Sequence, residues 1–168
     1  MTPAYFRTLA RYNAWANRRL YAACTELPEA ELKADRKAFF RSILGTLNHI
    51  LVADRAWLGR LEYVQFQVSG LEAVLYEDFA ALDMARRAED DRIAIHVGRL
   101  DEASLAEDLN YRNMAGAEQR TPMAWVLAHL FNHQTHHRGQ VHDMLSQMGR
   151  EPPPLDLIYH IREVGPVT

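Results

Sequence analysis

The sequence contains a single cysteine, Cys24, which excludes a disulfide framework and a zinc site built from cysteines. It has no apolar run near the roughly 20 residues of a membrane helix, and its polar N-terminus lacks the apolar core of a signal peptide. It also lacks a long basic run, and its net charge is −3. We therefore expect a cytoplasmic protein with neither a membrane nor a nucleic acid as partner.

The composition is that of a globular chain, with 48% hydrophobic and 24% charged residues among 168. This length predicts one domain, residues 1–168. Apolar residues recur at helical spacing over residues 3–27, 42–63, 78–100 and 121–149. The third segment has a charged, weakly patterned middle at residues 86–92. Thr121 and Pro122 suit the cap and first position of the fourth helix, which Gly149 and the following prolines end.

The connecting segments complete a prediction of the fold. Residues 28–40 and 64–77 are expected to be connections, and residues 101–120 resemble two short strands around a turn at 114–116. A short apolar tail follows at residues 155–161. Four long helices with little strand predict an all-α four-helix bundle with a long crossover between its second and third helices. The small hairpin before the last long helix would cover one end.

Histidine is concentrated in the fourth predicted helix. Five of the eight histidines lie there: His129, His133, His136, His137 and His142. The spacing of His129, His133 and His137 places them on one helix face, the same face that carries the apolar residues. Buried imidazoles need partners. They are either members of a hydrogen-bonded core network or ligands of a metal.

The second predicted helix offers a further candidate ligand, His49, beside its apolar stripe. Small residues lie around it, which predicts room for a metal with an open coordination position: Gly45, Thr46, Ala53 and Ala56. Asp54 falls on the same stripe, and it would either orient a histidine or make a buried helix–helix hydrogen bond.

Facing helices of a bundle build metal sites from inward side chains. Here His49 would meet His133 and His137, with His129 as a further candidate from the same face. Three histidines with an open fourth position are typical of catalytic zinc. Imidazole also suits nickel, copper and iron.

Four stretches resemble the DinB/YfiT-like family of metal-dependent enzymes, and in this order they span nearly the whole chain. They are YNAWAN at 12–17, SILGTLNHI at 42–50, HQTHHRGQ at 133–140 with its HxxxH-R-G-Q pattern, and LDLI at 155–158. The resemblance implies an up-up-down-down bundle and a homodimer. It also implies a divalent metal, zinc or nickel, bound by His49, His133 and His137.

The resemblance leaves other polar residues of the fourth helix around the expected metal. His129 and His136 are candidates for the pocket or for orienting a ligand, although His136 points about 100° away from His137. Arg138 is expected either to make an ion pair within the bundle or to bind an anionic substrate. Gln140, one turn past His137, would reach the open metal position or the neighbouring helix.

Relatives in this family resemble thiol-dependent transferases and isomerases. The metal would lower the pKa of a low-molecular-weight thiol, and the thiolate would attack a small electrophile. We therefore expect a thiol-dependent S-transferase acting on a small-molecule substrate. Three histidines equally allow a metal-dependent hydrolase, although Gln134 follows His133 where HExxH enzymes have glutamate. The alternative from another class is a non-catalytic metal-binding or stress-response protein.

Overall fold

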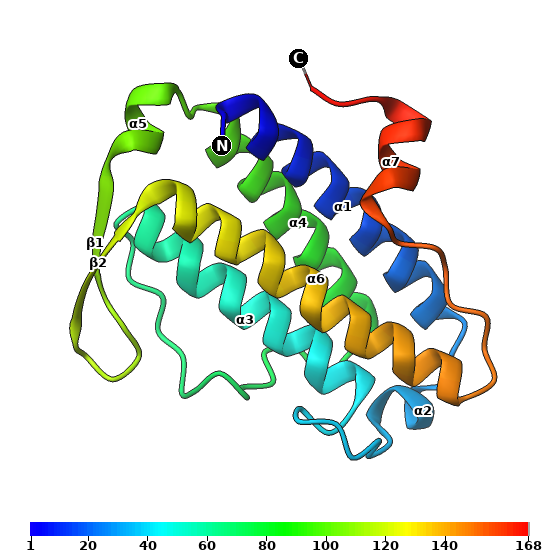
Figure 1. The fold of residues 1–168 in the computed structure, drawn as a ribbon. Coiled ribbons are helices and arrows are strands. Elements are labelled where there is room, and N and C mark those ends of the chain that lie inside the picture. The colour runs from blue at the N-terminus through cyan, green and yellow to red at the C-terminus, as the bar shows by residue number, and fades with distance from the viewer. Residues whose placement is uncertain (168) are drawn as a thin grey trace.

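Four long helices lie side by side in the structure, a computed structural model that describes residues 1–167 (Figure 1). They are α1 (Pro3–Thr25), α3 (Ile43–Leu61), α4 (Phe79–Gly98) and α6 (Met123–Gln147). The shorter helices are α2 (Glu29–Lys33), α5 (Glu102–Ala106) and α7 (Leu157–Val164). Among the described residues, no helix combines the length and apolarity needed to cross a membrane. The predicted all-α bundle is confirmed.

The direction of the helices differs from the prediction. One apolar cluster joins the N-terminal halves of α1 and α6 to the C-terminal ends of α3 and α4. A second cluster joins the opposite halves of the same helices. Thus α1 and α6 run one way and α3 and α4 the other, so the order is up-down-down-up and the up-up-down-down prediction is wrong. The 26–42 connection, which contains α2, reverses the chain, whereas the 62–78 crossover, which is equal in length, returns it along the bundle and leaves α3 and α4 parallel.

The predicted hairpin is present at one end of the bundle. Strands β1 (Asp108–Arg112) and β2 (Glu118–Pro122) pair antiparallel, with Asp108 opposite Pro122. This register extends through Thr121, which pairs with Leu109. The prediction that Thr121 caps the last long helix is therefore wrong. Helix α6 begins at Met123, with Pro122 before it and no side-chain cap.

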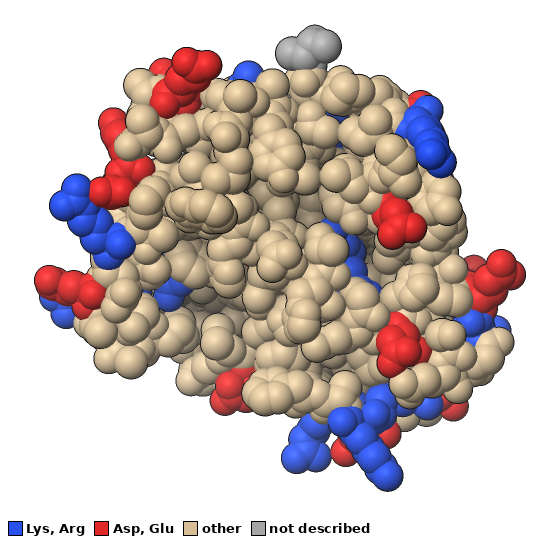
Figure 2. All heavy atoms as spheres, viewed as in Figure 1, with Lys and Arg blue, Asp and Glu red and all other residues tan. Residues whose placement is uncertain are grey.

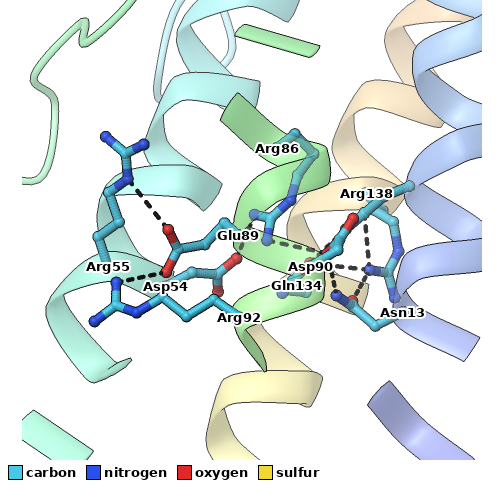
Figure 3. Close-up of polar contacts among 10 residues, drawn as sticks. Asn13, Asp54, Arg55, Arg86, Glu89, Asp90, Arg92, Gln134 and Arg138 are labelled. Carbon is cyan, nitrogen blue, oxygen red and sulfur yellow. Dashed lines mark hydrogen bonds and ion pairs between the residues drawn. The ribbon is translucent and has the colours of Figure 1, made fainter. Parts of the chain in front are cut away.

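A layer of buried polar side chains lies in the middle of the bundle, and all four long helices contribute to it (Figure 3). We call this set the polar layer: Asn13, Asn17, Asp54, Arg86, Asp90, Gln134 and Arg138. It includes part of the charged middle of α4, which turns inward. On the outer face shown in Figure 2, acidic and basic side chains are interspersed, and neither forms an extended patch.

Candidate metal centre

Three imidazoles meet between α3 and α6. The Nε2 atom of His49 lies 3.1 Å from Nε2 of His133 and 3.2 Å from Nε2 of His137. One potential ligand atom from each histidine lies within 4.8 Å of the others. Two nitrogen ligands of a tetrahedral zinc, each at its usual bond length, are about 3.3 Å apart. The three side chains thus have the spacing required to hold one metal ion.

Hydrogen bonds at the far side of two rings determine which nitrogens face the centre. His49 Nδ1 lies 2.8 Å from the carbonyl oxygen of Leu71, and His137 Nδ1 lies 2.8 Å from Oε1 of Gln140. Because these oxygens accept, each Nδ1 carries the proton of a neutral imidazole. The Nε2 atoms of both rings are then left as acceptors pointing at the same place.

The environment also keeps the three rings neutral. Burial lowers the pKa of His49 and of His137. Burial, reinforced by the neighbouring histidines, lowers the pKa of His133 to about 3. Neutral imidazole is the form that binds a metal. The cluster is therefore ready to accept a cation without first losing protons at neutral pH.

One side of the cluster is closed by Phe40, the last residue of the predicted 28–40 connection. Its ring stacks on His49 with the centroids 3.7 Å apart and meets His137 edge-on at 5.5 Å. A Cβ atom on Gly45 would lie 2.2 Å from the carbonyl oxygen of Phe40. Gly45 is therefore small to admit the Phe40 backbone, and the prediction that it leaves room around His49 is wrong. The glycine was the signal in the sequence for this close approach.

The other side of the cluster opens into a pocket of about 470 Å³, which we call the metal pocket. Ala53 and Ala56 line it, as their small size suggested. His129 also lines it, with its ring 5.7 Å from that of His133 and 5.2 Å from Trp57. His129 thus lies in the pocket and outside the three-histidine group.

The remaining candidate residues are placed as follows. Gln140 bonds His137 on its own helix, and its Nε2 lies 3.1 Å from Nε2 of the exposed His136, which is outside the cluster. Asp54 makes the buried contact between helices, a short ion pair with Arg86, and orients none of the three clustered histidines.

Arg138 forms no ion pair with a carboxylate among the described residues, so the expected ion pair is absent. Its guanidinium is buried and donates to oxygens of Asn13, Asn17 and Gln134, while Thr135 accepts from Nη2 at 3.1 Å. Amide and hydroxyl oxygens thus replace the predicted carboxylate. With its side chain within the polar layer, Arg138 does not line the metal pocket.

A helical bundle whose core brings three imidazoles together beside a pocket defines a class of proteins able to hold a metal between helices. Within that class, the chain belongs to the DinB family, whose family model matches residues 1–164. It is 26% identical over 157 residues to Protein DinB of Bacillus subtilis, with 88% of each protein covered. A crystal structure of a DinB-like protein from Bacillus cereus is similar, with a TM-score of 0.61, 19% identity and coverage of 83% of this chain and 89% of that one.

Proposed function

We propose that the protein is a metal-dependent enzyme in which His49, His133 and His137 bind one divalent ion, zinc or nickel. The convergence of neutral Nε2 atoms carries this proposal. Hydrogen bonds commit the protons of two rings to Nδ1, so without a cation at least two lone pairs face one another. Core histidines in a hydrogen-bonded network would instead alternate donors and acceptors.

The reaction we favour is transfer of a low-molecular-weight thiol to a small electrophile. The metal would lower the pKa of a thiol bound at its open position. Burial, followed by the nearby Arg60 guanidinium, lowers the pKa of His129, so this pocket imidazole is neutral and suited to accept the thiol proton. No carboxylate lines the described walls of the metal pocket. This absence favours thiol transfer over a hydrolase that depends on a glutamate base.

Metal content tests the site. Untagged wild-type protein is expected to contain about one divalent ion per chain by elemental analysis, as a three-histidine site predicts. His49→Ala and His133→Ala should lose it. His136→Ala is the matched control, because His136 neighbours a proposed ligand yet is exposed. Wild-type protein that stays empty after addition of zinc and nickel would contradict the proposal.

Turnover separates the enzyme from a non-catalytic metal-binding or stress-response protein. The metal-loaded protein is incubated with a panel of thiols and a chromogenic aryl halide, and formation of the thioether is followed. We expect a metal-dependent rate that His133→Ala abolishes. Stoichiometric metal without thioether formation across the panel would favour the non-catalytic alternative. A homodimer and a cytoplasmic location remain predictions of the sequence.

A further inference from the structure

Arg60 is unusual among the arginines of residues 1–167. Each of the others that is not exposed contacts a carboxylate or donates a hydrogen bond, whereas Arg60 has no such partner. Burial is the main influence on its pKa, which it lowers. A half-buried charge without an opposite charge is costly. The side chain is therefore available to an anion from outside the chain.

Aromatic rings fix the orientation of this guanidinium. Its carbon lies 4.5 Å from the ring centre of Trp57 and 5.2 Å from that of Tyr111. These two rings meet edge-on at 5.3 Å. Stacking covers the guanidinium face but does not consume its N–H groups, which lie in the plane of the group. This arrangement suits a carboxylate, which two parallel N–H groups bind together.

The same pocket contains Arg60 and the proposed metal ligands. His49, Ala53, Ala56 and Arg60 follow one face of α3, and all four line the metal pocket. The helix rises about 16 Å between His49 and Arg60. Long helical side chains lean towards the helix N-terminus, which here is towards His49. The two alanines leave space between these ends, and Leu71 contributes an apolar wall.

We propose that Arg60 is an anion-binding subsite of the metal pocket, and that the ligand is a small molecule with a carboxylate joined by an apolar body to its metal-binding end. The identity of that end as a thiol rests on the proposed function. Arg60 also borders a second cavity of about 630 Å³, which shares Ala56, Tyr111, Asn113 and Met114 with the metal pocket. A longer ligand can therefore continue past the guanidinium.

A series of ω-mercaptoalkanoates tests this subsite. Cobalt(II)-loaded protein is titrated with acids from 3-mercaptopropionate to 8-mercaptooctanoate, each compared with the mercaptoalcohol of equal length. The thiolate-to-cobalt absorption band reports Kd. At the length that joins the two ends, the acid should bind about tenfold more tightly than the alcohol, as expected for a charge-assisted bidentate pair.

Two variants test whether Arg60 causes the preference for the acid. In Arg60→Gln the preference for the acid should disappear while the Kd of the alcohol is unchanged. Arg55→Gln is the matched control on the same helix, because Arg55 is already paired with Glu89; it should keep the preference. Equal binding of acid and alcohol at every length would overturn the inference and leave the proposed function standing.

A different result separates the two proposals. If no thiol produces the cobalt band, the proposed function fails, and Arg60 is tested on metal-free protein. There, 6-phenylhexanoate should quench tryptophan fluorescence at lower concentration than 6-phenylhexanamide, and Arg60→Gln should remove the difference. Equal quenching by acid and amide in wild-type protein would then reject the subsite.

Discussion

The interior of the bundle has two polar regions that differ in how their groups are paired. In the polar layer, every charged group meets an opposite charge or an amide oxygen (Figure 3). In the histidine cluster, Nε2 atoms face one another and one side opens into a pocket. We infer that the first region stabilises the fold and that the second is arranged for a ligand that the chain does not supply.

The polar layer is balanced in charge and connects all four long helices. Asp90 forms an ion pair with Arg86 at 3.0 Å and accepts from Asn13 at 3.0 Å and from Asn17 at 2.9 Å. Asn17 also donates to Gln134 at 3.1 Å. These bonds join α1 and α4 to α6 between two apolar clusters. Apolar packing alone tolerates sliding of helices, whereas the directional bonds specify one register.

The largest expected effect comes from breaking this balance. Arg86→Met should lower the free energy of unfolding by about 3–5 kcal/mol, because Asp54 and Asp90 would remain buried without their cation. Urea unfolding at pH 7 measures the change. Arg87→Met is the matched control: Arg87 is the next residue, is exposed, and pairs with Asp83 at the surface. The control substitution should change the free energy of unfolding by less than about 0.5 kcal/mol.

The pH dependence of Arg86→Met gives a second check on the same prediction. Burial raises the pKa of Asp54, and Arg86 opposes this rise. Removing Arg86 should raise it further. A raised folded pKa contributes stability at low pH that is lost as pH increases, so the deficit relative to wild type should be larger at pH 8 than at pH 5. A deficit near zero at both pH values would show that the polar layer does not stabilise the fold.

A smaller effect is expected at the histidine cluster, in metal affinity. Gln140→Ala removes the acceptor that holds the His137 ring. Loss of such an orienting bond typically weakens metal binding by about 10–100-fold. Competition with a chromogenic zinc chelator measures this change. Gln147→Ala is the control on the same helix, because Gln147 is exposed and bonds only Asp143 among the described residues. Equal zinc affinity of wild type and Gln140→Ala would indicate that the His137 ring needs no support.

The two regions also differ in how far they could be predicted. The histidines were found because helical spacing places His133 and His137 on one face and because His49 lies beside an apolar stripe. The charged middle of α4 was recognised only as weakly patterned, since nothing within α4 shows that Arg86 is buried. Its partner Asp54 lies 32 residues earlier in the chain, on α3. Such pairings depend on the helix directions, for which the up-up-down-down prediction was also wrong.

The same limit applies to the walls of the metal pocket. Phe40 lies outside every helix, and its position over His49 depends on the backbone of the 34–42 segment, where Lys37 and Arg41 have positive φ angles. Arg60 stands out because it has no carboxylate or hydrogen-bond partner among the described residues. No local sequence pattern shows that such a partner is absent. By contrast, the hairpin followed from local turn residues, and the long crossover followed from the absence of helical spacing.

The Cys24 thiol is a third kind of buried polar group and sharpens the comparison. Unlike the polar layer it has no side-chain hydrogen-bond partner among the described residues, and unlike the histidine cluster it does not face the metal pocket. It is buried in the apolar cluster opposite the hairpin, and burial raises its pKa to about 12. In the unfolded chain a thiol titrates near pH 8.5. The stability that follows from a raised folded pKa is present below that pH and is lost as pH rises towards 12. Between pH 8 and pH 10, wild-type protein should therefore lose about 1.9 kcal/mol more than Cys24→Ala. Urea unfolding of metal-free, reduced protein measures both slopes, and the cost of the alanine cavity cancels because it does not depend on pH. Parallel slopes would mean that the Cys24 thiol ionises in the folded protein with the pKa that it has in the unfolded chain, and that burial does not keep it protonated.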